Sequence, residues 1–324
     1  MSGELETIRF STAEELEHAN RETGWDIEYR QLLRAPCSSD YAFREWTESV
    51  LMHERHHGSL EASGAPPPAM AALIIPGKPN GRVTFQGEAL SGDELLLVAP
   101  GGEIDSVILE GLEVLSFCLP WSVFFDAARC VDAVLPEEGS IKALAVRRPP
   151  EQVDGLRRHL RGLLERTDSA DERTQRARTS NFALDFAQPL FCRGNDPAMN
   201  APYRSTSHRK HLSLAKEYLD ANMKGPVKMA DVCAHAGIPL RTLERVFQRE
   251  LSVSPNRYLL ARRLSAVRRA LVAVDPEHGI VKRVAMDHGF THMGRFAVNY
   301  RRQFAETPSQ TLNRVRLPLP VSAC

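Results

Sequence analysis

The spacing of apolar residues changes once along the chain, near Pro136. Before it, from Trp25 to Leu135, short apolar or alternating runs are separated by Pro, Gly and Asn, as in strands of a small antiparallel barrel or sandwich. The predicted strands are residues 26–33, 69–76, 82–87, 93–100, 105–111 and 113–120. The segment "SLEASGAPPPAM" is predicted to be a loop, because its three prolines cannot lie in a central strand.

After Pro136 the apolar positions follow the period of a helix. One helix is predicted to begin at Pro150, and its apolar residues fall on a single face. They are Val153, Leu156, Leu160, Leu163 and Leu164. A second apolar helical segment, "TSNFALDFAQPLFCR", is interrupted by Pro189, and a polar stretch precedes it. Residues 208–316 read as helix with brief breaks, and no strand pattern competes there.

A short pattern occurs twice in this last region, as "AHAGIPLRTLERVF" and "AMDHGFTHMGRFAVNY". The copies align on Gly237 and Gly289. An apolar residue follows each glycine, and two further apolar residues lie four apart, at Leu243 and Phe247 in the first copy. Phe296 and Tyr300 form the corresponding pair in the second copy. At the same distance beyond each pair comes a Ser-Pro or Thr-Pro dipeptide, Ser254-Pro255 and Thr307-Pro308.

Each part of this pattern has a physical role. Glycine adopts the left-handed conformation that ends a helix, so the chain can turn sharply. Apolar residues four apart face the core and leave the other faces of the helix free. Ser or Thr before Pro caps the next helix. A glycine between two helices is common, but two in-register copies predict a helix-turn-helix at residues 228–250 and again at 280–303.

Charge is divided between the two ends of a chain whose net charge is zero. Residues 205–316 hold 20 Lys and Arg against 9 Asp and Glu, a net charge of +11, and residues 1–204 carry −11. A basic segment of this kind favours a polyanionic partner.

The stretches "RTLERVFQRELSVSPNRYLLARRLSAVRRAL" and "VAMDHGFTHMGRFAVNYRRQFAETPSQTL" resemble the AraC/XylS family of bacterial transcription regulators. The resemblance covers residues 208–316. It implies two helix-turn-helix units joined by one long helix, here Pro255–Val272. Both recognition helices would then read successive major grooves of double-stranded DNA, roughly 34 Å apart.

The resemblance also implies a fold class and a domain order. We expect an α+β protein with a cupin-like β-barrel sensor and dimerisation domain in residues 1–195, β-rich to about 135 and helical over 150–193. A linker at 196–207 and an all-α DNA-binding domain at 208–316 follow. A small-molecule effector of unknown identity, a homodimer and RNA polymerase are the other expected partners.

The first recognition helix is predicted over Leu240–Glu250. Its outward residues are Arg241, Thr242, Glu244, Arg245 and Gln248. Arg suits guanine, Gln adenine and Glu cytosine. By resemblance, Arg241, Glu244 and Arg245 occupy base-contacting positions, and Thr242 is a phosphate partner. Pro239 stands where the family commonly has Ser or Thr, and we expect the helix to begin there with proline in its first turn.

The second recognition helix is predicted over Thr291–Gln303. Its exposed residues are expected to be Thr291, His292, Met293, Arg295 and Asn299. His292, Met293 and Arg295 are the predicted base contacts, with Met293 packing on a thymine methyl.

The acidic half carries one candidate metal motif, "HERHH" at His53–His57. Metal-binding cupins typically use H-x-H followed by Glu and a later His, which this chain lacks, so we expect no metal and an exposed polar loop. Aromatic residues of this half could line a small-molecule pocket or simply form a core. The aromatic residues are Trp25, Tyr41, Phe43, Trp46, Phe117, Trp121 and Phe124.

The remaining sequence features exclude several classes of protein. No catalytic motif or cofactor fingerprint is found, so we expect no enzyme activity and no cofactor. The six cysteines form no C-x-x-C pair, and neither a membrane span nor a signal sequence is recognised, which favours the cytoplasm. Two alternatives to an effector-controlled regulator remain open. They are a cupin-type metalloenzyme with a nucleic-acid-binding tail and a nonspecific architectural DNA binder.

Overall fold

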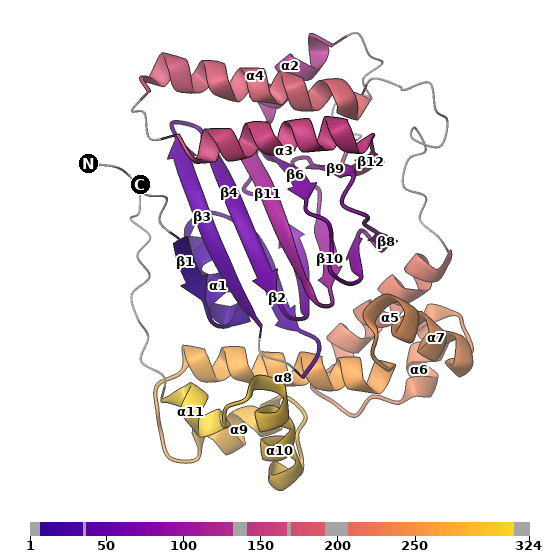
Figure 1. The fold of residues 1–324 in the computed structure, drawn as a ribbon. Helices are drawn as coiled ribbons and strands as arrows, with labels where there is room; N and C mark the ends of the chain where they lie inside the picture. The colour runs from indigo at the N-terminus through magenta and orange to yellow at the C-terminus, as the bar shows by residue number, and fades with distance from the viewer. Residues whose placement is uncertain (1–6, 35–36, 132–140, 167–169, 192–206, 314–324) are drawn as a thin grey trace.

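In the computed structural model, residues 7–34, 37–131, 141–166, 170–191 and 207–313 are described. They form two antiparallel sheets followed by a helical region (Figure 1). The fold is therefore α+β, as predicted, but the expected barrel is not closed, because the strands form two separate sheets. The predicted linker at 196–207 lies outside the described residues except for Ser207, the first residue of a helix.

The larger sheet has seven strands in the order β1-β3-β4-β11-β6-β9-β12. The strands are β1 (Thr7–Phe10), β3 (Ser38–Trp46), β4 (Ser49–His57), β6 (Met70–Pro76), β9 (Glu94–Val98), β11 (Gly111–Pro120) and β12 (Ala143–Arg147). Both faces of its central strands are covered. Leu73 and Ile75 of β6 pack against the helices outside, and Ala72 and Ile74 face the second sheet. This burial explains why β6 and β9 read as continuous apolar runs.

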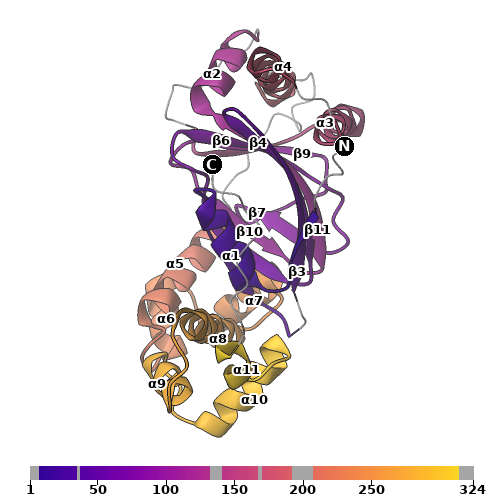
Figure 2. The same cartoon turned by 90° about the vertical axis from the view of Figure 1, so that its left-hand side faces the viewer.

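The smaller sheet has five strands in the order β2-β5-β10-β7-β8. The strands are β2 (Asp26–Gln31), β5 (Leu60–Ala65), β7 (Val83–Phe85), β8 (Glu88–Ala89) and β10 (Ile104–Ile108). Helix α1 (Ala13–Glu22) precedes β2 and buries Leu16 in the core between the sheets. Figure 2 shows the curved larger sheet, with the strands of the smaller one beside it.

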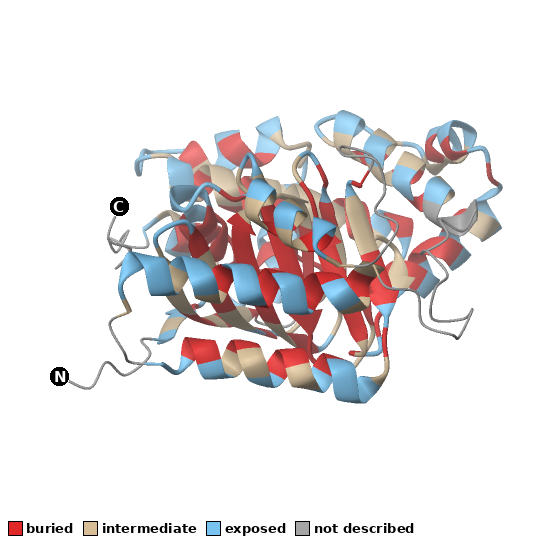
Figure 3. Cartoon of the chain, turned by 90° about the horizontal axis from the view of Figure 1, so that it is seen from above, coloured by how far each residue is buried: buried red, intermediate tan, exposed pale blue. Residues whose placement is uncertain are grey.

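Three helices cover the outer face of the larger sheet. They are α2 (Trp121–Arg129), α3 (Pro150–Leu164) and α4 (Glu172–Phe191). The predicted apolar face of α3 is buried, from Val153 to Leu164. Figure 3 shows the outward faces of these helices exposed and the strands beneath them buried. Helix α4 begins earlier than predicted, at Glu172, and Pro189 lies within its last turn rather than interrupting it.

The helical region contains seven helices in its described residues. They are α5 (Ser207–Asn222), α6 (Met229–Ala236), α7 (Leu240–Leu251), α8 (Pro255–Ala273), α9 (Ile280–Asp287), α10 (Met293–Phe304) and α11 (Pro308–Leu312). Helix α8 lies along the smaller sheet, with α5 to α7 at one end and α9 to α11 at the other (Figure 1).

Several predictions about the strands were wrong. The predicted loop at residues 59–70 contains β5, which ends at Ala65, before the three prolines. The predicted polar loop at His53–His57 is the end of β4. The region rich in β-structure also extends past residue 135, because β12 pairs with β9. Six predicted strand segments overlap observed strands, but β1, β3, β4, β5, β8 and β12 were not predicted.

Candidate nucleic-acid interface and sensor cavity

The two repeated segments form two helix pairs of the same design. Gly237 ends α6 with a φ of 67°, and Gly289 follows α9 with a φ of 81°. Both values lie in the left-handed region, as the pattern predicted. Ser254 accepts a hydrogen bond from the backbone of Arg257 at the start of α8, and Thr307 forms a capping box with Gln310 at the start of α11. The capping residues therefore act as their positions predicted.

The apolar stripe of each pair is buried as expected. Leu243, Phe247 and Leu251 of α7 are fully buried, and Phe247 packs edge-on against Tyr258 of α8. Phe296, Tyr300 and Phe304 of α10 are buried in the same way. The helix was predicted to begin at Pro239, but Pro239 is extended and directly precedes α7, and its carbonyl oxygen accepts hydrogen bonds from the backbone of Thr242 and Leu243. Helix α7 therefore forms without a side-chain cap.

The predicted reading residues of α7 lie largely on its exposed surface. Arg241, Glu244, Arg245 and Gln248 are exposed, and Thr242 is half-buried. In the described part of the chain, Arg241 and Arg245 form no ion pair, so both guanidinium groups are free to meet a ligand. Arginine in this state is suited to bidentate contacts with guanine or phosphate.

The second pair differs from the prediction at its start. Helix α10 begins at Met293, so Thr291 and His292 precede it, with His292 at the capping position. Both are exposed, as is Arg295. Met293 was predicted to be exposed, but it is half-buried and packs against the core of this helix pair. Asn299 is also half-buried.

Helix α8 directs most of its basic residues toward other parts of the protein. Arg262 pairs with Asp220 and lies 3.8 Å from Glu61. Arg268 pairs with Glu14 and Glu306, and Arg269 contacts Glu17 at 3.4 Å. Glu14 and Glu17 lie on α1 and Glu61 lies on β5, and all three belong to the acidic half of the chain. Part of the charge asymmetry of the chain is therefore neutralised within the molecule.

A second candidate site is the cavity between the two sheets, of about 80 Å³. It is lined mainly by apolar and aromatic side chains from both sheets. The apolar and aromatic lining includes Trp25, Ile27, Met52, Ala62, Ile74, Phe85, Leu96, Ile104, Ile108 and Val114. A polar cluster occupies one part of its wall, formed by Tyr29, Tyr41, Glu54, His56 and Ser116. An apolar cavity with a few converging polar groups is the usual form of a small-molecule site.

Glu54 is the centre of that polar cluster. Its carboxylate accepts hydrogen bonds from Tyr41 Oη at 2.5 Å and Ser116 Oγ at 2.9 Å, and His56 Nε2 lies 3.3 Å away. Burial favours a higher pKa for Glu54, but the hydrogen bonds and the charge interaction with His56 outweigh it, so the pKa is lowered. The cavity therefore presents an ionised carboxylate.

The histidines of β4 alternate between the two faces of the larger sheet. His56 lines the cavity, and its Nδ1 lies 2.9 Å from Ser39 Oγ. His53 contacts Glu113 at 2.5 Å, and His57 contacts Asp40 at 2.9 Å. Alternation along a strand thus separates the residues that the motif placed together. Among the residues that the structure describes, no group of His, Cys, Asp and Glu is placed to hold a metal.

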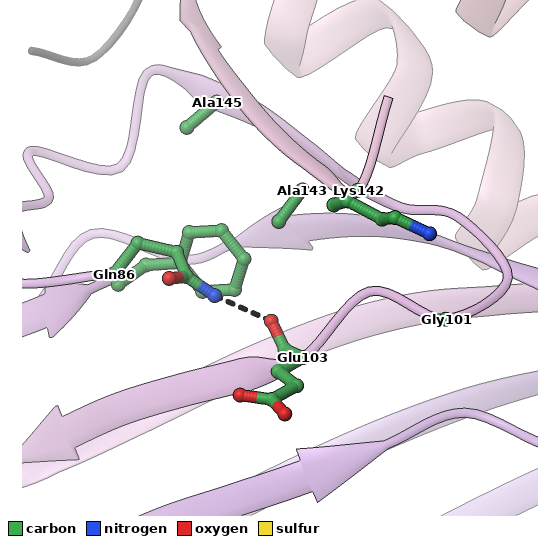
Figure 4. Close-up of a pocket in the computed structure, with 7 residues that line it drawn as sticks. Gln86, Gly101, Glu103, Lys142, Ala143 and Ala145 are labelled. Carbon is green, nitrogen blue, oxygen red and sulfur yellow. Dashed lines mark hydrogen bonds between the residues drawn. The ribbon is translucent and has the colours of Figure 1, made fainter. Parts of the chain in front are cut away.

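A hollow of about 390 Å³ lies at the edge where the two sheets meet (Figure 4). Gln86, Glu103 and Lys142 line it, and the Gln86 amide donates a hydrogen bond to the backbone carbonyl of Glu103. Phe85 lines both this hollow and the inner cavity. Phe85 therefore borders both spaces.

Comparisons with known proteins agree with the geometry of the helical region. The family described as "Helix-turn-helix domain" matches residues 232–314. The XylDLEGF operon transcriptional activator of Pseudomonas putida is 28% identical over 261 residues, which cover 75% of this chain and 74% of that protein. The chain belongs to the AraC/XylS family of transcription regulators. As an AraC/XylS regulator it binds DNA, and its relatives are regulators rather than enzymes.

Two other relatives match about a third of this chain. The "Probable thc operon regulatory protein" of Rhodococcus erythropolis is 36% identical over 104 residues. That match covers 32% of this chain and about a third, 31%, of that protein. The crystal structure of a probable AraC family transcriptional regulator from Rhodopseudomonas palustris is 32% identical. It covers 33% of this chain and 98% of that chain, with a TM-score of 0.30. Within the described residues of this AraC/XylS regulator, no helix is both long and apolar enough to span a bilayer.

Proposed function

We propose that the protein activates transcription by binding one DNA duplex through two helix-turn-helix units, α6–α7 and α9–α10. Arg241, Glu244 and Arg245 of α7 read bases in one major groove. His292, Met293 and Arg295 at the start of α10 read the next groove. Thr242, Gln248, Thr291 and Asn299 complete the two surfaces. The observation that carries this proposal is that the repeated units have matching buried stripes and keep exposed arginines on both reading helices.

The proposed domain order follows from the clusters of buried residues. Residues 1–195 would form a cupin-like sensor whose two sheets enclose the cavity, residues 208–316 would bind DNA, and the linker between them would end before Ser207, where α5 begins. The two cores of the sheets contain no residue of α5 to α11. The name of the Pseudomonas putida relative supports activation rather than repression.

Affinity for DNA is expected to fall steeply with salt concentration, because contacts to phosphates release condensed counterions. A duplex recovered from a random-sequence library by the full-length protein would serve as probe. We expect its affinity to fall by at least about tenfold between about 50 and 200 mM salt. Fluorescence anisotropy measures the change. An affinity that does not respond to salt, or a selection that recovers no preferred sequence, would refute specific binding through these surfaces.

The sensor cavity is proposed to bind a small, largely apolar effector that donates a hydrogen bond to Glu54. The apolar lining accommodates an uncharged body, and the ionised Glu54 repels a carboxylate ligand. Phe85 would turn aside to admit the effector from the outer hollow.

Phenol is expected to raise the melting temperature of the protein, and benzoate is expected to raise it less. Val114→Phe, which fills the cavity from the larger sheet, should remove the response to phenol. The response of Val114→Phe to phenol is measured from the melting temperature of the same variant without ligand. This reference is needed because overpacking alone costs roughly 1–3 kcal/mol of folding stability. Equal responses of the wild type and Val114→Phe would show that phenol binds elsewhere. Stronger stabilisation by benzoate would contradict the role given to Glu54.

A further inference from the structure

The two reading helices contact the smaller sheet at equivalent positions of the repeat. Glu250 lies three residues after Phe247 in α7, and Gln303 lies three residues after Tyr300 in α10. Both side chains are buried, with exposed fractions of 7% and 1%. Both also lie in the last turn of their helix, away from the ends that carry the proposed base contacts.

Each of these residues bonds to a group beside the smaller sheet. Arg82, directly before β7, donates from Nη2 to Glu250 Oε2 at 2.8 Å. Gln303 Nε2 donates to the backbone oxygens of Gln31 at 2.8 Å and Leu33 at 3.2 Å. Gln31, the last residue of β2, donates in turn to the backbone oxygen of Gln303 at 2.5 Å. The sheet therefore holds the rear end of each reading helix.

A third contact lies between these two. Glu61 of β5 is 1% exposed and receives hydrogen bonds from Lys216 of α5 and Tyr258 of α8. The distances are 2.7 Å from Lys216 Nζ to Oε1 and 3.1 Å from Tyr258 Oη to the same oxygen. Arg30 and Arg262 lie 3.7 and 3.8 Å from Oε2. The smaller sheet and the residues beside it therefore contact the helical region at α7, at α10 and, between them, at α5 and α8.

Apart from the sheet, the two helix pairs are connected by α8 and by the close approach of Gly289, after α9, to the backbone of Met223 and Lys224, after α5. Their buried cores share no residue, and α8 is the element that both cores contain. Helix α8 has 19 residues and is about 28 Å long, and a helix of this length can bend. The core of the first pair also includes Leu32 and Val107 of the sheet segment. Views from two directions show the smaller sheet beside α8 (Figures 1 and 2).

We infer that the smaller sheet is a clamp that fixes the spacing and rotation between the two reading helices. The inference rests on the proposed function, in which both helices read one duplex. The clamp leaves the reading surfaces uncovered, because Arg241, Arg245 and Arg295 are exposed while the clamp is closed. It therefore selects operators by the separation of their two halves and does not block DNA binding.

The same strands connect the clamp to the sensor cavity. Tyr29 of β2, Ala62 of β5 and Phe85 of β7 line the cavity, and Gln31, Glu61 and Arg82 lie one to three residues from them. A ligand that shifts these strands also shifts the clamp. Effector binding would then change which separation between operator halves is preferred.

The test exchanges the charges of one contact and varies operator spacing. Arg82→Glu, Glu250→Arg and the double exchange are compared with wild type on the selected duplex and on one lengthened by a single base pair between the halves. We expect the insertion to weaken wild-type binding by about tenfold. Each single variant should lose most of that discrimination, and the double exchange should restore it. Arg9→Glu, an exposed residue on β1, is the control for net charge.

The outcomes separate the clamp from the proposed function. If the wild type binds no duplex specifically, the proposed function fails. If it binds specifically but the single variants keep the full penalty for insertion, the clamp is refuted. Tighter binding of both single variants to both duplexes would also refute it, since the contact would then be inhibitory. Failure of the double exchange to restore discrimination would show that the Arg82–Glu250 pair is not the cause.

Discussion

The double variant Arg245→Ala/Arg295→Ala is expected to lose about 2–6 kcal/mol of specific DNA binding, the largest effect on binding predicted here. Each arginine that reads a guanine contributes about 1–3 kcal/mol, and the two lie on separate helices in separate grooves. Their losses should therefore add. Anisotropy titrations of the selected duplex with each single variant and the double variant measure the effect.

Additivity is the informative part of this result. The control is Arg158→Ala/Arg173→Ala, which removes two exposed arginines from α3 and α4 and the same charge. It should leave affinity almost unchanged. If the control lost as much affinity as Arg245→Ala/Arg295→Ala, the effect would come from net charge alone. If one single variant lost all of the affinity and the other none, a single reading helix would carry the recognition.

Glu61→Gln is expected to lose about 3 kcal/mol of folding stability, because it leaves Lys216, Arg30 and Arg262 without their shared carboxylate. The value is at the low end for a buried ion pair, since Lys216 and Arg262 each contact a second carboxylate, Asp105 and Asp220. Burial alone would raise the pKa of Glu61, but the three cations lower it from 4.5 to about 2. That difference corresponds to about 3 kcal/mol in favour of the ionised form.

The lowered pKa of Glu61 determines how its contribution to folding stability should change with pH. Because the pKa of Glu61 is lower in the folded protein, its contribution is complete above about pH 4.5 and is lost as the pH falls toward about 2. Urea unfolding of wild type and Glu61→Gln at neutral pH and near pH 3 measures it. The difference between the two proteins should shrink at the lower pH. Glu103→Gln, an exposed residue of the same half, should change stability by less than about 0.5 kcal/mol. A difference between wild type and Glu61→Gln that does not depend on pH would contradict this account.

The helical region could be predicted closely because its signals are local. Gly237 and Gly289 mark turns, Ser254 and Thr307 mark helix starts, and residues four apart mark the buried stripe. Helix α8 was predicted to end at Val272 and ends at Ala273. The start of α10 was missed by two residues, since Thr291 and His292 precede the helix as its capping segment.

The sensor half was predicted less well because its strands pair over long distances. Strand β4 carries the polar sequence "HERHH", yet Glu54 forms a hydrogen bond with Tyr41 and His56 forms one with Ser39 in the interior of the protein. Those partners lie on β3, and no local pattern reveals them. Strand β5 was read as loop because of the prolines that follow it, so the clamp contact of Glu61 was missed as well.

The charge asymmetry was only partly a signal for DNA. Arg262, Arg268 and Arg269 of the basic end pair with carboxylates, several of them in the acidic half. The arginines that remain exposed on α7 and α10 are the better indication of a polyanionic ligand. The expected homodimer and contact with RNA polymerase stay predictions of the family resemblance.

Footprinting of a selected duplex is the most direct test of two reading helices acting on one DNA molecule. The wild type should protect two major-groove segments on one face of the duplex, about one helical turn or roughly 34 Å apart. Arg245→Ala should weaken protection of one segment and Arg295→Ala that of the other. A single protected segment, or the same segment weakened by both variants, would contradict the account.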